Sequence, residues 1–285
     1  MPKIRVLIVD DAVVVRKILT DTLSTDPDIE VSTAANGKIA LQKIPQVNPD
    51  VVTLDVEMPE MDGLETLREI RKTYPKLPVI MFSTLTGRGA ATTLDALSAG
   101  ASDYATKPAN VGKVGEAMAR VREEMIPKIR ALCGRDAGAA PSAGVGGGSG
   151  AATLAAPAAA PRPKPPIAPA VRPGTRAGID VVAIGVSTGG PNALSVVLPG
   201  LAKDLPVPVV LVQHMPPVFT KLLAERLDTQ CGVRVVEGAA GMRLQAGHVY
   251  IAPGGQHMVV EREGGVLKLA LNMEPPENSC RPAVD

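Results

Sequence analysis

Ser187 stands in a segment whose residue types suit a nucleophile. It lies between Gly185 and Gly189, directly after the apolar run 181–186. Such a run next to glycine predicts a buried strand of a parallel sheet. The two glycines permit the sharp strand-to-helix turn that exposes a serine hydroxyl. A serine that only binds an anion or supports a tight turn would have the same surroundings, so the neighbouring segments must decide.

A histidine at the end of the next apolar run could activate that hydroxyl. His214 closes the run 205–214, and the two prolines at 216 and 217 stop the strand. Side chains at the ends of neighbouring parallel strands lie about 5 Å apart. A serine needs such a base, because its own pKa leaves almost no alkoxide at neutral pH. Ser187 and His214 are therefore the candidate catalytic residues.

Two other readings of this segment fail. A dinucleotide site would need a second glycine where Ser187 stands and a ribose-binding carboxylate near the position of His214. An α/β-hydrolase would place an acid between the serine and a late histidine.

His257 is the rival candidate for the base. We expect it in a turn, which fixes the position of its ring less well than a strand end does. We expect His248 to be structural and Thr188 to cap the following helix.

Polar side chains also end the apolar runs of the N-terminal part. Carboxyl ends of parallel strands meet at one edge of a sheet, where such folds place their sites. Carboxylates that meet there repel one another unless a hard cation such as Mg²⁺ binds, and a lysine completes the charge balance. The run ends are Asp10 with Asp11, Asp55, Ser83 and Lys107.

The elements that must position these residues form two α/β domains joined by a linker. The chain has 285 residues, and 134–176 is almost entirely Ala, Pro, Gly and Ser. Such a stretch cannot offset its ordering entropy by burying apolar surface, so we expect a flexible linker. Its basic residues are sparse and the formal net charge is +1, which argues against nucleic-acid binding. The predicted segments are a first domain at 1–125, a helix extension with linker at 126–177, and a second domain at 178–285.

Several helices and strands are expected inside these domains from apolar periodicity. The segment 111–132 predicts a helix that Pro127 interrupts. The second domain is expected to hold a helix at 217–227, strands at 232–236 and 248–252, and a hairpin of 258–262 with 266–271.

Cysteine usage and the N-terminus indicate the compartment. The three cysteines are widely spaced and odd in number, which argues against disulfides or a zinc site. The chain shows no signal-peptide pattern and no run of about 20 apolar residues. We therefore expect a cytoplasmic protein without membrane insertion, and a monomer.

The first domain resembles the receiver domain of two-component response regulators. The resemblance implies a flavodoxin-like fold with a parallel five-stranded sheet. It also implies that Asp55 accepts a phosphoryl group from a histidine kinase and that Asp10, Asp11, Asp55 and the Glu57 carbonyl hold Mg²⁺. Ser83 and Lys107 would bind the phosphoryl oxygens, and Tyr104 would be the switching aromatic residue. The residues that carry the match are Asp10, Asp11, Asp55, Met58, Pro59, Asp62, Gly63, Ser83, Tyr104, Lys107 and Pro108.

The whole chain, apart from the linker, is similar to the CheB family of chemotaxis response regulators. The similarity rests on the segments 83–86, 100–104, 185–191, 213–216, 247–254 and 257–258. It implies a doubly wound α/β esterase domain that hydrolyses glutamyl methyl esters of chemoreceptors and deamidates receptor glutamines. Ser187 would attack, and His214 would act first as base and then as acid. The N–H groups of Thr188, Gly189 and Gly190 are the oxyanion candidates.

The resemblance also names partners and one departure. The partners would be the cytoplasmic domains of chemoreceptors and a chemotaxis histidine kinase, and the ester chemistry would need no cofactor. In the family a third triad residue, an aspartate, lies in a Gly-Met-Gly-x-Asp-Gly segment, and this sequence reaches Asp285 first. We therefore expect an esterase domain truncated at the C-terminus, with the acid unassigned and hydrolysis weak. The alternative is a phosphorylation-gated binding or decoy protein with an inactive esterase half.

Overall fold

The computed structural model describes residues 2–107, 114–134, 178–278 and 280–284. Most of the predicted linker, residues 135–177, lies outside the described residues. The N-terminal and C-terminal α/β parts are therefore described one at a time. None of the helices in the described ranges combines the length and the apolar character that a membrane span requires.

The N-terminal part contains a fully parallel five-stranded sheet, as predicted. Its strand order is β2-β1-β3-β4-β5. Every residue of the central strands β3 and β4 is buried, which is typical of parallel strands covered on both faces. The strands are β1 (Ile4–Val9), β2 (Ile29–Ala34), β3 (Val51–Asp55), β4 (Val79–Ser83) and β5 (Asp103–Thr106).

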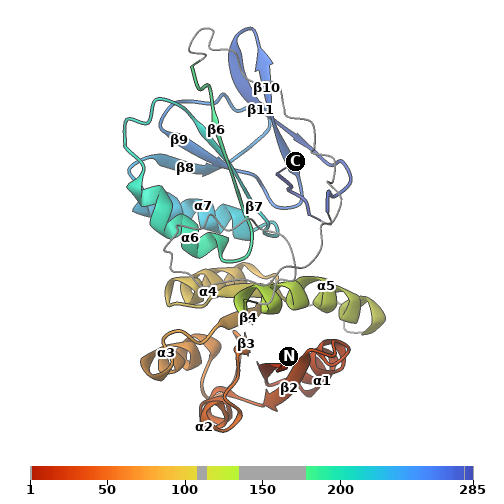
Figure 1. Cartoon of the computed structure of the whole chain (residues 1–285). Coiled ribbons are helices and arrows are strands. Elements are labelled where there is room, and N and C mark those ends of the chain that lie inside the picture. Colours follow the sequence, from red (N-terminus) through yellow and green to blue (C-terminus); the bar gives the residue numbers. More distant parts are fainter. Residues whose placement is uncertain (1, 108–113, 135–177, 279, 285) are drawn as a thin grey trace, which may run out of the picture. The chain divides into compact units, whose positions relative to one another are not determined.

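Five helices cover the two faces of this sheet. Helices α1 and α5 pack together, and α2, α3 and α4 follow one another on the opposite face (Figure 1). Helix α3 begins with a capping box, in which Asp62 and Glu65 each accept a hydrogen bond from the other's backbone N–H. The helices are α1 (Val13–Leu23), α2 (Gly37–Val47), α3 (Gly63–Thr73), α4 (Gly87–Ser98) and α5 (Val114–Leu132).

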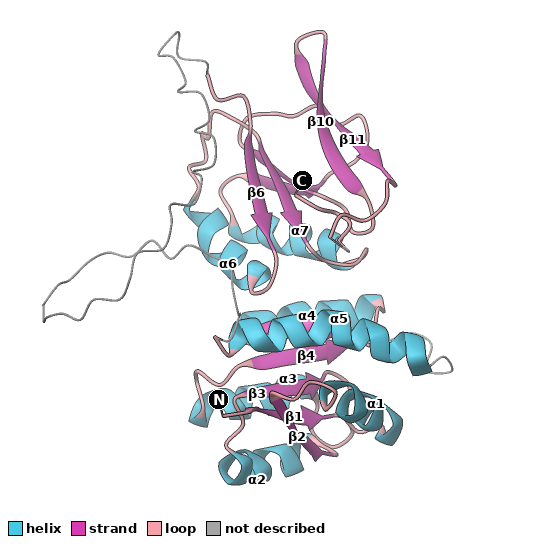
Figure 2. Cartoon of the chain, turned by 45° about the vertical axis from the view of Figure 1, so that its right-hand side comes forward, coloured by secondary structure: helices cyan, strands magenta, loops and turns pink. Residues whose placement is uncertain are grey.

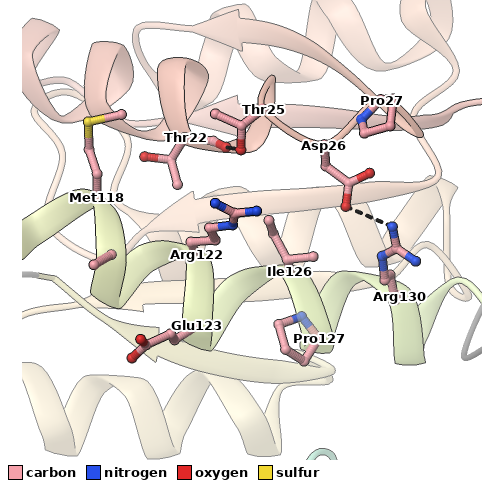
Figure 3. Close-up of a pocket in the computed structure, with 11 residues that line it drawn as sticks. Thr22, Thr25, Asp26, Pro27, Met118, Arg122, Glu123, Ile126, Pro127 and Arg130 are labelled. Carbon is pink, nitrogen blue, oxygen red and sulfur yellow. Dashed lines mark hydrogen bonds and ion pairs between the residues drawn. The ribbon is translucent and has the colours of Figure 1, made fainter. Parts of the chain in front are cut away.

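Pro127 does not interrupt α5, so that prediction was wrong. The helix continues through the proline to Leu132. Proline removes one backbone donor from a helix, and here the proline is exposed, so water can reach the carbonyl that lacks a partner. Pro127 lines a cavity of about 760 Å³, together with other residues of α5, with Thr22 of α1 and with the segment 25–27 (Figure 3). Across this cavity Arg130 pairs with Asp26 at 2.8 Å.

The C-terminal part contains a four-stranded parallel sheet and a separate hairpin. The order of the sheet is β6-β7-β9-β8, and helices α6 and α7 both lie on one of its faces (Figure 2). The hairpin turns at Gly264 and Gly265, as predicted, and both glycines have positive φ. The elements are β6 (Val182–Val186), α6 (Gly190–Val197), a 3-10 turn η1 (Leu198–Gly200), β7 (Val209–Gln213), α7 (Phe219–Gln230), β8 (Arg234–Glu237), β9 (His248–Ile251), β10 (His257–Glu263) and β11 (Val266–Asn272).

Two sequence-based expectations for this sheet were wrong. Strand β6 is not a buried core strand: in the described sheet it is one of the two edge strands, and Ala183 and Gly185 are exposed. The apolar run had suggested a buried strand, whereas among the described strands β6 pairs with β7 alone. Strand β7 begins at Val209 rather than at residue 205, because Pro206 and Pro208 lack the N–H that a ladder needs.

Candidate active site and phosphoacceptor site

Ser187 and His214 lie side by side at the carboxyl ends of β6 and β7. The parallel register pairs Val186 with Gln213, so the residues that follow them, Ser187 and His214, also lie opposite each other. The Oγ atom of Ser187 lies 3.2 Å from Nδ1 of His214. Nδ1 can accept the serine proton when the neutral ring carries its own proton on Nε2. The structure thus brings together the two residues that the sequence singled out.

The ring of His214 also lies close to a residue that the sequence did not suggest. The Sγ atom of Cys280 lies 3.5 Å from Nδ1, the same nitrogen that faces Ser187. Burial lowers the pKa of His214 below its ordinary value of 6.5, which keeps the ring in the neutral form that a base requires. Within the described ranges, no carboxylate forms a hydrogen bond with this ring.

The turn after β6 has a backbone conformation that depends on glycine. Gly189 is the N-cap residue of α6 and adopts φ 71°, in the left-handed region that glycine tolerates. Thr188 was expected to cap this helix, and that expectation was wrong: the helix begins at Gly190, and no side chain caps it. Thr188 lies one residue too early in the chain for that role.

The three oxyanion candidates are not equivalent. The N–H of Gly190 donates a hydrogen bond of 2.8 Å to the carbonyl of Ser187 and is therefore engaged. The N–H groups of Thr188 and Gly189 remain candidates. The helix that follows has eight residues and contributes its positive end to the same region.

Gln213 is a buried polar residue that the sequence reading passed over. Its side chain is 2% exposed, and its Nε2 donates to the carbonyl of Ser187 at 3.1 Å and to that of His214 at 3.4 Å. The residue type could have predicted this role. A glutamine at the end of an otherwise apolar strand, directly before the candidate base, must find buried hydrogen-bond partners.

His257 was expected in a turn, and that expectation was wrong: it is the first residue of β10. Both ring nitrogens have backbone partners: Nδ1 faces the N–H of Ala283 at 3.4 Å, and Nε2 faces the carbonyl of Pro275 at 3.2 Å. A histidine whose nitrogens are both engaged has no free lone pair for a substrate proton. His248 opens β9, and its Nδ1 lies 3.0 Å from the carbonyl of Ala246, in agreement with a structural role.

The loop after His214 is held by close backbone packing. A Cβ atom on Gly254 would lie 2.3 Å from the backbone C of Pro216 and the backbone N of Pro217, so only glycine fits here. The N–H of Gly254 donates to Oγ1 of Thr220 at 3.0 Å, and that hydroxyl donates to Glu237 at 2.6 Å. These contacts fix the loop on which His214 stands.

The carboxylates of the N-terminal part form the cluster that the sequence predicted. One carboxylate oxygen from each of Asp10, Asp11 and Asp55 lies within 4.8 Å of the others. Asp10 and Asp55 are buried, whereas Asp11 is exposed. Nζ of Lys107 lies 2.9 Å from Oδ2 of Asp10 and 2.7 Å from Oδ2 of Asp55. The receiver-like part therefore places an acidic cluster and one lysine at the carboxyl edge of its sheet.

Burial sets the protonation of the central carboxylate. It raises the pKa of Asp55 to about 6, with a further contribution from the charge of Asp10, although the hydrogen bond from Lys107 acts in the opposite direction. The two carboxylates raise the pKa of Lys107 despite its own burial. Among the described residues of this cluster, three carboxylates face one ammonium group, so negative charge is in excess there.

The remaining predicted residues surround this cluster to different extents. Ser83 ends β4, is fully buried, and donates to the carbonyl of Thr84 at 3.3 Å. The N–H of Glu57 donates to Oδ1 of Asp55 at 3.2 Å, and Glu57 and Asp11 line a cavity of about 430 Å³. Tyr104 lies in β5, where Nζ of Lys128 is 4.8 Å from the centre of its ring.

Family models match the two α/β parts separately. The model described as response regulator receiver domain matches residues 6–119, and the model described as CheB methylesterase matches residues 182–285. A receiver domain followed by a CheB methylesterase domain defines the class of protein: a response regulator with an enzymatic output domain.

Known proteins match over the full chain. A protein of Nocardioides sp. named protein-glutamate methylesterase/protein-glutamine glutaminase is 52% identical over 286 residues, covering 100% of this chain and 74% of the relative. A protein of the same name from Trichodesmium erythraeum is 49% identical over 291 residues, covering 100% of this chain and 77% of the relative. The chain belongs to the protein-glutamate methylesterase/protein-glutamine glutaminase family.

Two solved structures from Thermotoga maritima match one part each. The receiver domain of its CheB is 40% identical with a TM-score of 0.42, covering 47% of this chain and 99% of that structure. The catalytic domain of its CheB is 45% identical with a TM-score of 0.36, covering 37% of this chain and 56% of that structure.

Proposed function

We propose that this chain is a phosphorylation-activated hydrolase that removes methyl esters from glutamyl residues of chemoreceptors and deamidates receptor glutamines. In this proposal residues 1–125 are the receiver, 126–177 a helix extension and linker, and 178–285 the esterase domain. The observation that carries the proposal is the 3.2 Å contact between Ser187 Oγ and His214 Nδ1, inside the segment that matches the methylesterase model. Nothing in the comparisons supports the alternative of a binding or decoy protein.

The ester chemistry follows from the position of the two side chains. Ser187 Oγ attacks the ester carbonyl while His214 Nδ1 takes the hydroxyl proton, and the negative charge on the tetrahedral intermediate is stabilised by the N–H groups of Thr188 and Gly189. The imidazolium then donates its proton to the leaving methoxide, so methanol departs and an acyl-enzyme remains. Water, deprotonated by His214, hydrolyses that acyl-enzyme to the free glutamate and restores the serine. With a glutamine substrate the leaving group is ammonia. These steps use side chains and backbone N–H groups and no cofactor.

The receiver chemistry follows from the acidic cluster. Asp55 is the phosphoryl acceptor, Lys107 and Ser83 bind the phosphoryl oxygens, and Tyr104 responds to the change. The donor set suits Mg²⁺, because three carboxylates within 4.8 Å carry more negative charge than one lysine can neutralise, and this ion prefers hard oxygen ligands. Asp10, Asp11, Asp55 and the Glu57 carbonyl would hold it. When bound, Mg²⁺ neutralises charge on the phosphoryl oxygens.

The partners follow from the two reactions. A chemotaxis histidine kinase would supply the phosphoryl group, and the cytoplasmic domains of chemoreceptors would supply the esters. The predictions of a cytoplasmic location and a monomeric state belong to the same proposal.

The proposal is tested by methanol release from a methylated cytoplasmic fragment of a chemoreceptor. Ser187→Ala and His214→Gln should each lower the rate by roughly 10⁴-fold or to the limit of detection, as in other serine hydrolases. Ser195→Ala and His248→Gln are the matched controls, because the hydrogen bonds that their side chains form in the described part of the chain are with backbone carbonyls of the same domain, away from Ser187 and His214. A wild-type rate that persists in Ser187→Ala would overturn the proposal.

A further inference from the structure

We propose that Gln213 is a positioning residue that aims the oxyanion donor of Thr188 by holding the carbonyl of Ser187. The inference rests on the proposed esterase function and names a residue to which that chemistry gives no role. Gln213 is the last residue of β7 and lies opposite Val186 in the register, one residue before the contact between Ser187 and His214.

The contacts of its amide fix the orientation of the side chain. Nε2 donates to the Ser187 carbonyl at 3.1 Å and to the His214 carbonyl at 3.4 Å. Carbonyl oxygens only accept hydrogen bonds, so the NH₂ group and not Oε1 must face them. One amide thereby links the two chain segments that carry the nucleophile and the base.

The Ser187 carbonyl is held by two donors at once. The N–H of Gly190 reaches it from the start of α6 at 2.8 Å, and the amide of Gln213 reaches it from the neighbouring strand. The C=O and the N–H of a trans peptide point in opposite directions. Because the carbonyl of Ser187 points to the buried amide of Gln213, the N–H of Thr188 in the same peptide points away from it. Ser187 and Thr188 are both exposed, so that N–H is directed to the open side of the turn.

Packing alone does not explain a glutamine at this place. Its Oε1 atom is buried and has no hydrogen-bond partner in the described part of the chain. An apolar side chain of equal length would avoid that unfavourable burial. A Cβ on Gly190 would lie 1.8 Å from this oxygen, so the oxygen faces the Cα–H of Gly190, and the absence of a side chain there makes room for the amide.

The first test compares variants of the full-length chain that keep the shape of the side chain and change its hydrogen bonding. Gln213→Met removes the donor, and Gln213→Glu replaces it with an acceptor that repels both carbonyls. Gln230→Met, at the exposed end of α7, is the matched control. The readout is the rate at which a fluorophosphonate probe labels Ser187, measured by mass spectrometry well below the unfolding temperature of each variant. We expect labelling to slow by roughly 10- to 100-fold in both Gln213 variants, because the oxyanion donor is no longer aimed.

A second readout does not depend on the reactivity of the serine. Hydrogen exchange of the backbone amides from Thr188 to Gly190 should become faster in Gln213→Met, while the exchange of strand β9 stays unchanged. On receptor esters, kcat should fall and KM should stay within about twofold, since the substrate contacts are retained. The midpoint of the pH profile should also stay in place, because His214 still acts as the base.

A third variant distinguishes the steric fit of the Gln213 side chain from its hydrogen bonds. Gly190→Ala should destabilise the protein through the contact with Oε1, and the double variant Gly190→Ala with Gln213→Ala should regain thermal stability but not the labelling rate. If Gln213→Met labels and exchanges like the wild type, the positioning role is wrong. If the wild type itself is not labelled at Ser187 while exchange still rises in Gln213→Met, the proposed esterase function fails and the positioning of the turn stands.

Discussion

Nζ of Lys107 lies 2.7 Å from Oδ2 of Asp55, at the centre of the acidic edge of the receiver-like sheet. The lysine follows β5 and the aspartate ends β3, so the contact spans the ends of two strands that are separated by β4. This pair places one positive charge where a phosphoryl group on Asp55 would carry its negative charge.

The first prediction is that Asp55 is the only phosphoryl acceptor. Asp55→Asn should abolish incorporation of phosphate from a small phosphodonor with Mg²⁺ and should also remove the increase in methanol release that the donor causes. Asp21→Asn, on the exposed side of α1, is the control and should behave like the wild type. Equal labelling of Asp55→Asn would show that another residue accepts the phosphoryl group.

The second prediction concerns the loss of folding stability that the buried, ionised carboxylate of Asp55 causes. Asp55 has a pKa raised by burial from 3.8 to about 6, so the folded state binds this proton more tightly than the unfolded state. Stability therefore falls as the pH rises from about 4 through about 6, and the charged group costs at most about 3 kcal/mol above that range. In chelator at pH 8, Asp55→Asn should raise the melting temperature of the receiver.

The control for this stability effect is the pH. At about pH 4 the carboxyl of the folded wild type is largely protonated, so Asp55→Asn and wild type should melt at similar temperatures. Saturating Mg²⁺ at pH 8 should likewise reduce the difference, since the ion stabilises the charged carboxylate. A melting difference that is the same at both pH values would contradict the assignment of the shift to this group.

The third prediction is a pH profile controlled by His214. Burial lowers the pKa of this ring below 6.5, so the neutral base persists to a lower pH than for an exposed histidine. The acid limb of kcat/KM should therefore have its midpoint below pH 6.5 and should be absent from the residual activity of His214→Gln. An unchanged acid limb in that variant would assign the titration to a different group.

The fourth prediction tests the close packing behind His214. Gly254→Ala would place a Cβ 2.3 Å from backbone atoms of Pro216 and Pro217, which no rotamer change can relieve. We expect a loss of about 1–3 kcal/mol in stability, together with a lower rate of probe labelling at Ser187. Gly200→Ala is the control, because a Cβ there meets no atom within 4 Å. Equal stability of the two variants would show that the loop can shift without cost.

The sequence by itself determined which residues stand at strand ends. Apolar runs that end on Asp55, Ser187 or His214 are local patterns, and a parallel sheet brings such ends to one edge. The pairing of Ser187 with His214 followed from the adjacency of successive strands, which β6 and β7 obey. The motifs around these residues also carried the resemblance to the family.

Only the tertiary structure decided how each side chain and peptide group is used. It showed that Thr188 does not cap α6, that Gly190 already uses its N–H, and that both nitrogens of His257 have partners. It also brought Cys280 to the ring of His214, across a sequence separation of 66 residues. The physical reason is that hydrogen-bond partners and close approaches depend on contacts between distant segments, whereas periodicity and turn chemistry report only on neighbours along the chain.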